Sequence, residues 1–126
     1  YKQRIAKQIM LPFDNIEALQ VLRYTKGQKY ETHADYFPES LLDSSGNRIC
    51  TCLAYLNTPE EGGETVFPLT TPAATQTEEN GWSECGREGL GVKAHRGDVI
   101  CFWDMDTDGK PDPFSKHHAC PIINGK

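Results

Sequence analysis

Short runs of β-forming residues, each closed by a turn that contains glycine or proline, recur along most of the sequence. The chain has 126 residues, of which 11 are glycine and 8 are proline. Short strands separated by such turns are typical of antiparallel sandwiches and barrels. We therefore expect strands at residues 17–24, 29–37, 48–56, 60–68, 89–95, 96–104 and 115–123.

The sequence also predicts how these strands are connected. Residues 89–95 and 96–104 are expected to form a hairpin that turns near Arg96, Gly97 and Asp98. Residues 38–47, 69–88 and 106–113 are polar and rich in turn residues, so we expect loops there. Only residues 1–10 have a helical pattern, in which Ile5, Ile9 and Met10 are the apolar positions and Pro12 ends the helix.

Many short strands and one helix favour a mainly β fold. We expect a single domain over residues 1–126, built as an antiparallel double sheet of the jelly-roll type, that is, a double-stranded β-helix with an N-terminal helix. Such a fold has eight core strands, and the last strand expected here ends near residue 123. We therefore expect the domain to be a fragment that lacks its C-terminal strand.

Composition and charge exclude several classes of protein. With 37% hydrophobic and 25% charged residues, the chain has the composition of a globular protein. The net charge is −5 and no basic patch is evident, which argues against a nucleic-acid partner. No run of about 18 apolar residues is present, so we expect no membrane span. No signal peptide is visible, and the sequence begins with Tyr1.

Five cysteines leave at least one thiol unpaired. Cys50 and Cys52 lie in the apolar run ICTCLAYL and are interpreted as small buried apolar side chains. Cys85 and Cys120 lie in turn-like contexts and are better candidates for a disulfide, which would imply an oxidising compartment. No C-x-x-C pair is present, so a structural zinc knuckle is not expected.

The stretch YETHADYF at residues 30–37 places His33 and Asp35 two residues apart. On a strand these side chains share one face, where an imidazole and a carboxylate can bind one metal ion. A third ligand must come from the remaining histidines. His95 lies beside a Gly-Asp turn and is expected to be exposed, whereas only one of His117 and His118 can face inward from a strand.

Two histidines and one carboxylate form the facial triad of non-haem Fe(II) oxygenases. The same ligands can hold zinc, although no general base for zinc hydrolysis is evident beside them. A zinc-stabilised structural domain and a non-catalytic jelly-roll binding module are therefore alternatives, and H-x-D alone does not distinguish them.

Six blocks of sequence in one order narrow the choice. Together they resemble the catalytic domain of the prolyl 4-hydroxylases, members of the 2-oxoglutarate/Fe(II) dioxygenases, and in particular the plant- and alga-like and the collagen-modifying enzymes. The blocks are LQVLRYTKGQKYETHADYF (19–37), NRICTCLAYLN (47–57), EEGGETVFP (60–68), WSECG (82–86), GLGVKAHRGDVICFW (89–103) and DPFSKHHACPIINGK (112–126).

This resemblance implies a role for particular residues. His33 and Asp35 match the family's H-x-D pair, and the H-x-x-C-P pattern selects His117 as the third metal ligand. His118 occupies a position that is usually small, and its side chain is expected to face outward. Tyr24 and Thr65 match positions that hydrogen-bond the distal carboxylate of 2-oxoglutarate.

Other matching positions concern the substrate groove and a disulfide. Tyr30 and Arg48 match positions that line the peptide-substrate groove, although Tyr30 could also be a core aromatic residue. Cys85 and Cys120 match a pair that is disulfide-bonded in some relatives. The family's lysine that pairs with the 2-oxoglutarate carboxylate would be residue 127, and Lys126 falls one position short, so we expect this chain by itself to bind 2-oxoglutarate poorly.

The resemblance implies hydroxylation of peptidyl proline to 4-hydroxyproline, with decarboxylation of 2-oxoglutarate to succinate. The implied cofactors are Fe(II), 2-oxoglutarate, O₂ and L-ascorbate, and the implied partner is a proline-containing peptide or protein. The loops at 38–47 and 69–88 are then expected to act as lids. A related dioxygenase that acts on lysine or another side chain remains an alternative. The family also implies the secretory pathway, in the endoplasmic reticulum or Golgi lumen, and nothing in the sequence specifies an oligomeric state.

Overall fold

The computed structural model describes residues 1–42 and 46–125. In this part of the chain short strands dominate, and the α-helix is α1 (Lys2–Ile9). The mainly β class with an N-terminal helix is therefore confirmed. The strands are β1 (Tyr30–His33), β2 (Cys50–Ala54), β3 (Glu61–Gly62), β4 (Thr65–Phe67), β5 (Leu90–Val92), β6 (Val99–Trp103), β7 (His117–Ala119) and β8 (Ile122–Asn124). Single 3-10 turns are η1 (Phe13–Asn15), η2 (Glu39–Leu41), η3 (Glu78–Asn80), η4 (Cys85–Arg87) and η5 (Pro113–Ser115).

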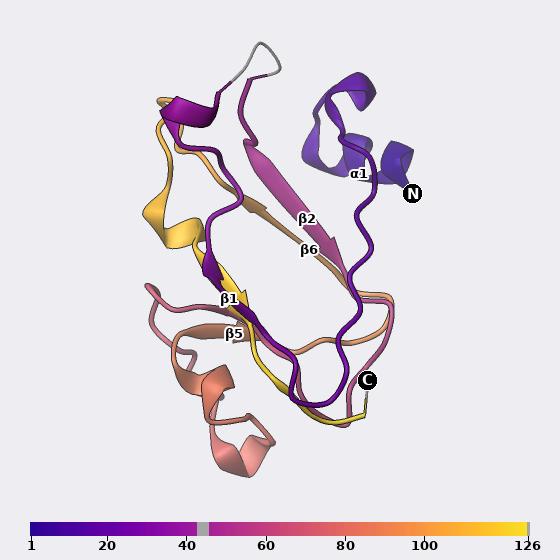
Figure 1. Ribbon diagram of the computed structural model, residues 1–126, viewed down its shortest axis with the longest axis vertical. Helices are drawn as coiled ribbons and strands as arrows, with labels where there is room; N and C mark the ends of the chain where they lie inside the picture. The colour runs from indigo at the N-terminus through magenta and orange to yellow at the C-terminus, as the bar shows by residue number, and fades with distance from the viewer. Residues whose placement is uncertain (43–45, 126) are drawn as a thin grey trace.

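Two antiparallel sheets form the double layer expected of a jelly roll (Figure 1). One has the strand order β1-β7-β4-β5, and the other is the ribbon β2-β6. Phe102 of β6 connects the layers, because its ring packs edge-on against Phe67 of β4 at 5.0 Å and against His117 of β7 at 4.9 Å between ring centroids. A third pair, β3-β8, lies beside them.

Strand register decides which side chains lie between the two layers. His33 is paired with His117, and Thr65 with Ala119, so these residues share one face of the larger sheet. Phe102 on the opposing ribbon contacts this face. Val66 is paired with His118 on the other face, where Val66 is fully buried.

The predicted strand at 60–68 is divided in two by its paired glycines. Gly62 and Gly63 have φ values of 78° and 73°, in the left-handed region that side chains disfavour. A Cβ on Gly62 would also collide with the carbonyl oxygen of Pro121. The chain bends sharply here, so β3 and β4 belong to different sheets.

The hairpin predicted from 89–95 and 96–104 is wrong. The turn itself is present: Gly97 has φ 98°, and Asp98 N–H donates to the His95 carbonyl at 3.0 Å. However, β5 pairs with β4, and β6 pairs with β2. The segment between them therefore crosses from one sheet to the other, as jelly-roll connectivity requires.

Of two other strand predictions, the one at 17–24 is wrong and the one at 115–123 is partly correct. Residues 17–24 are not a strand, because they have no ladder partner among the described residues, and Leu19 and Val21 remain exposed. Residues 115–123 divide into β7 and β8, with Cys120 and Pro121 between them. Proline lacks the N–H that a continuous ladder needs at this point.

The expected loop at 69–88 is attached to the larger sheet by buried polar side chains. Gln76 is buried, and its amide donates to the carbonyls of Gly86 and Gly89 at 2.9 and 2.8 Å. Glu64 is also buried and accepts hydrogen bonds from the backbone and hydroxyl of Ser83 at 3.0 and 2.9 Å. These bonds hold η4 against the outer face of the sheet. Of the expected loop at 38–47, residues 43–45 lie outside the described residues.

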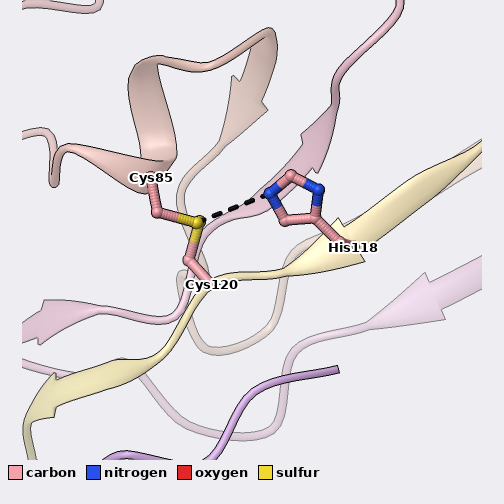
Figure 2. A group of neighbouring side chains, drawn as sticks. All are labelled: Cys85, His118 and Cys120. Carbon is pink, nitrogen blue, oxygen red and sulfur yellow. Dashed lines mark hydrogen bonds between the residues drawn. A yellow bond between two sulfur atoms is a disulfide. The ribbon is translucent and has the colours of Figure 1, made fainter. Parts of the chain in front are cut away.

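Two disulfides each link neighbouring segments on one side of the double layer. Cys85 of η4 is bonded to Cys120, which follows β7 (Figure 2), and Cys52 of β2 is bonded to its cross-strand partner Cys101 of β6. The interpretation of Cys52 as a small apolar side chain is therefore wrong, while Cys50 is a half-buried free thiol. In the described part of the chain, no helix has the length and apolar character needed to cross a membrane.

His118 does not face solvent as expected. Its side chain points away from the space between the sheets, but η4 and the Cys85–Cys120 disulfide cover it, and the residue is 8% exposed. The sequence pattern identified its face of the strand correctly and missed the segment packed over that face.

Candidate metal centre

The three predicted ligands come together at one end of the β1–β7 ladder. His33 is the last residue of β1 and is paired in register with His117, the first residue of β7. Their rings lie 4.4 Å apart between centroids. β1 ends at His33, and the bend that follows turns Asp35 back toward both rings. Local chain direction therefore positions one ligand, and strand pairing positions the other two.

The ligand atoms converge on one small volume. Asp35 Oδ1 lies 3.4 Å from His33 Nε2, and Asp35 Oδ2 lies 3.8 Å from His117 Nε2. All three ligand atoms lie within 4.8 Å of one another. The side chain of His117 is 10% exposed and that of His33 is 30% exposed, so the cluster is closed on the β7 side and open on the β1 side.

Backbone carbonyls orient both imidazoles. His33 Nδ1 lies 2.8 Å from the carbonyl of Glu31, and His117 Nδ1 lies 3.0 Å from the carbonyl of Ser115. Because a carbonyl can only accept, each Nδ1 carries the proton and each Nε2 directs its lone pair toward Asp35. Burial lowers the pKa of His117, which favours the neutral, metal-binding form.

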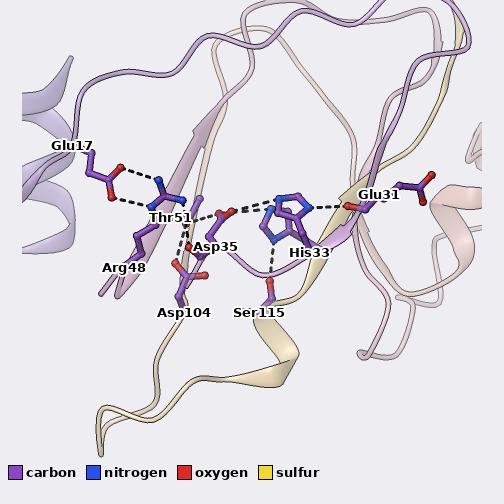
Figure 3. A network of polar contacts seen from close by, with 9 residues as sticks. Glu17, Glu31, His33, Asp35, Arg48, Thr51, Asp104 and Ser115 are labelled. Carbon is purple, nitrogen blue, oxygen red and sulfur yellow. Dashed lines mark hydrogen bonds and ion pairs between the residues drawn. The ribbon is translucent and has the colours of Figure 1, made fainter. Parts of the chain in front are cut away.

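The half-buried Thr51 and the buried Asp104 support the carboxylate from behind (Figure 3). Thr51 Oγ1 on β2 lies 2.7 Å from Asp35 Oδ2 and 2.9 Å from Asp104 Oδ2. Asp104 follows β6 and has no exposed surface. Burial, and secondarily the charge of Asp35, raises the pKa of Asp104 to about 6. The Thr51 hydroxyl has one hydrogen, so it donates to one of the two carboxylates at a time. Below pH about 6 Asp104 is protonated and can donate to Thr51, which leaves the Thr51 hydrogen for Asp35.

Sequence reasoning missed Thr51 and Asp104. Thr51 looked like one residue of an apolar strand, although its register partner Phe102 shows that it faces the metal cluster. Asp104 directly follows the apolar run VICFW, and an acid at the end of an apolar run is a signal that could have been followed.

The donor set suits a divalent metal with open coordination positions. Two neutral imidazole nitrogens and one carboxylate are the ligands of the Fe(II) facial triad. Each imidazole donates its other ring N–H to a backbone carbonyl, and the carboxylate accepts from Thr51, as metal sites in proteins usually require. The three residues therefore fit an iron site chemically.

Thr65 lies on the same inner face as the metal cluster. It is buried on β4, and Tyr55 Oη donates to its Oγ1 at 2.8 Å. Because Tyr55 satisfies one lone pair of this hydroxyl, the hydrogen of Thr65 is free to bind an anion. Tyr24 is half-buried, and burial followed by the neighbouring Tyr30 raises its pKa. Tyr24 and Thr65 were predicted from the sequence, whereas the role of Tyr55 was not. Lys126 lies outside the described residues.

The two residues expected to contact substrate lie at the rim of the cluster. Tyr30 is 42% exposed, and its ring lies 4.2 Å from that of His33. Arg48 binds both carboxylate oxygens of Glu17, at 2.9 and 3.0 Å (Figure 3). Its guanidinium lies 4.7 Å from the ring of Phe37. Arg48 is therefore held beside Asp35, with its charge already paired in this structure.

Comparison with known proteins identifies relatives over most of the chain. The family model described as the 2OG-Fe(II) oxygenase superfamily matches residues 19–126. Probable prolyl 4-hydroxylase 7 of Arabidopsis thaliana is 41% identical over 124 residues, covering 98% of this chain and 39% of the relative. Probable prolyl 4-hydroxylase 3 of the same plant is 46% identical over 126 residues, covering 98% of this chain and 44% of the relative.

A solved structure shows the same relationship. The viral collagen prolyl hydroxylase from Paramecium Bursaria Chlorella virus-1, in its 2OG complex, superimposes with a TM-score of 0.57 at 27% identity, over 81% of this chain and 49% of that chain.

The chain therefore belongs to the 2OG-Fe(II) oxygenase superfamily. Among its members the chain is similar to prolyl 4-hydroxylases, and it spans less than half the length of the curated relatives it matches.

Proposed function

We propose that the protein hydroxylates peptidyl proline to 4-hydroxyproline, using 2-oxoglutarate and O₂. The observation that carries this proposal is the convergence of His33, Asp35 and His117 on one volume, with both imidazoles already hydrogen-bonded to backbone carbonyls. The similarity to prolyl 4-hydroxylases supports proline over other side chains as the target.

In this proposal His33, Asp35 and His117 hold Fe(II). When bound, the iron supplies the chemistry that couples decarboxylation of 2-oxoglutarate to oxygen insertion into a C–H bond. The chain itself orients the ligands: the Glu31 and Ser115 carbonyls fix both rings, and Thr51 fixes the carboxylate. Thr65 and Tyr24 bind the distal carboxylate of 2-oxoglutarate, and Tyr30 and Arg48 position the peptide.

The position of the site also indicates how water is limited. Phe67 and Phe102 pack against His117, so the inner wall of the cluster is apolar. The more exposed His33 and Tyr30 form the open side, from which a peptide can approach. An apolar wall strengthens the interaction between the carboxylate ligand and a cation, because the local dielectric is low.

We further propose that the protein works in the secretory pathway and is sustained by L-ascorbate. The two disulfides support an oxidising compartment, where such bonds persist. The need for ascorbate follows from the similarity to prolyl 4-hydroxylases alone, and running the assay below with and without added L-ascorbate tests it: repeated turnover should be lost without it.

The proposal is tested by anaerobic reconstitution of the full-length protein with Fe(II), followed by addition of O₂, 2-oxoglutarate and a proline-rich peptide. We expect succinate release that depends on the peptide, and a peptide that gains one oxygen atom at proline. A matched peptide with lysine in place of proline should release no additional succinate. Hydroxylation of the lysine peptide, or an absence of peptide-dependent succinate, would contradict the proposed substrate.

Replacing Tyr55 by phenylalanine is expected to weaken 2-oxoglutarate binding. The change removes the hydroxyl that donates to Thr65, so Thr65 can turn its own hydrogen elsewhere. Loss of one oriented hydrogen bond to an anion should raise the KM for 2-oxoglutarate roughly tenfold. Tyr1→Phe removes the same atom from an exposed position and is the control. An unchanged KM in Tyr55→Phe would show that Tyr55 does not position Thr65.

A further inference from the structure

A second group of potential metal ligands lies on the opposite face of β7 from the iron site. It consists of Cys85, His118 and Cys120, whose ligand atoms all lie within 4.8 Å of one another (Figure 2). His117 and His118 are adjacent on one strand, so their side chains point to opposite faces. The second cluster is therefore separate from His33, Asp35 and His117.

His118 is buried but has only weak partners at its outer nitrogen. Nδ1 lies 3.3 Å from Thr32 Oγ1, and Nε2 lies 3.4 Å from Cys85 Sγ. A disulfide sulfur carries no proton and is a poor acceptor, so this contact is worth less than an ordinary hydrogen bond. An imidazole with an anchored Nδ1 and a free Nε2 is the usual arrangement of a metal-binding histidine.

The distances match those of a tetrahedral zinc site. A sulfur at about 2.3 Å and a nitrogen at about 2.05 Å from a tetrahedral ion lie roughly 3.5 Å apart. The observed separation of Cys85 Sγ from His118 Nε2 is 3.4 Å. The two sulfurs must separate, and rotation about their Cα–Cβ bonds can achieve this between Cα atoms that are 5.9 Å apart.

A fourth ligand is also available at the surface. Glu88 follows η4, and its Oε2 lies 3.9 Å from His118 Nε2. Its side chain is 59% exposed, so it can move toward an ion bound by the two thiolates. Two thiolates, one imidazole and one carboxylate complete a tetrahedral set of ligands that zinc accepts.

We propose that reduction of the Cys85–Cys120 disulfide creates a thiolate site for a divalent metal of the zinc type, with Cys85, Cys120 and His118 as ligands and Glu88 as the fourth. A dithiol reductant transfers two electrons and two protons, becoming a cyclic disulfide and leaving two thiols. Zinc then binds both sulfurs and releases the two protons. The site is independent of the proposed hydroxylase activity.

The test uses Co²⁺ as the probe, because bonds from cobalt to thiolate give a near-ultraviolet charge-transfer band that nitrogen and oxygen ligands do not give. The full-length protein is reduced with a phosphine, which, unlike a dithiol, does not chelate the metal. We expect the band in the reduced protein and its absence in the oxidised protein. Addition of Zn²⁺ should remove the band by displacement. A reduced protein without the band would overturn the proposal.

Variants identify the ligands. The double variant Cys85→Ser with Cys120→Ser should lose the band, whereas Cys52→Ser with Cys101→Ser should keep it and serves as the control for the other disulfide. His118→Gln preserves a polar side chain of similar size and should weaken Co²⁺ binding on the order of 100-fold. A band that survives in the first double variant, or an unchanged affinity in His118→Gln, would also overturn the proposal. Thermal unfolding of each oxidised variant verifies that it is folded.

Discussion

Replacing Asp35 by alanine is expected to abolish 2-oxoglutarate turnover in the full-length protein, and His33→Ala is expected to do the same. Asp35 is the carboxylate of the cluster, and it lies within 3.8 Å of both Nε2 atoms. Loss of a residue that hydrogen-bonds to a metal ligand typically lowers activity by up to about 100-fold. Loss of a ligand itself should therefore reduce turnover by more than about 100-fold. Succinate formation, measured with saturating Fe(II) and 2-oxoglutarate, provides the comparison.

The appropriate control is a histidine outside the cluster. His95 lies on the turn that precedes β6, its side chain is 61% exposed, and it pairs with Asp98 at 3.6 Å. His95→Ala should leave turnover and metal content unchanged. Retained turnover in Asp35→Ala or His33→Ala would reject the assignment of the metal ligands. A loss of turnover with full metal content would instead assign the residue to a later step.

The fold could be predicted from sequence to the level of strands and class, because alternation and turn residues act locally. The segment at 60–68 breaks at its glycines, but the strand predicted at 115–123 runs through Pro121, where the structure interrupts it. Pairing could not be obtained in the same way. The turn at Gly97 looked like a hairpin, but whether the strands on either side of it pair depends on the rest of the sheet. In the structure β5 pairs with β4, and β6 pairs with β2.

The candidate site shows the same division between local and non-local information. The H-x-D spacing paired His33 with Asp35, although Asp35 lies in the bend after β1 and not on the strand, and the family pattern selected His117 over His118. The supporting residues Thr51 and Asp104 were missed because their roles depend on contacts between the two layers. His118 was assigned to the correct face of β7, yet only the three-dimensional structure shows that Cys85 covers it.

The protonation of Asp104 should make stability depend on pH in a direction opposite to that of most acids. Its pKa is raised from 3.8 to about 6 in the folded protein, chiefly by burial. Between these values the folded state binds a proton that the unfolded state has lost. The stabilising contribution is therefore fully present below pH about 4, falls as the pH rises, and is lost above pH about 6.

The size of this effect follows from the shift of the pKa. A change of about two pH units corresponds to about 3 kcal/mol of unfolding free energy at most. Asp104→Asn removes the titrating group but keeps a donor, because the amide can serve Thr51 as the protonated carboxyl does. The wild-type protein should therefore lose stability relative to this variant as the pH is raised from 4 to 7.

Urea unfolding of the metal-free, full-length protein at a series of pH values measures the difference directly. Subtracting the Asp104→Asn curve removes the contributions of all other carboxylates, since these are common to both proteins. Parallel curves would show that the pKa of Asp104 is not raised in the folded protein, and would contradict the prediction. A gap that widens from pH 4 to 7 would show that the folded protein holds Asp104 protonated at low pH, in the form that can donate to Thr51.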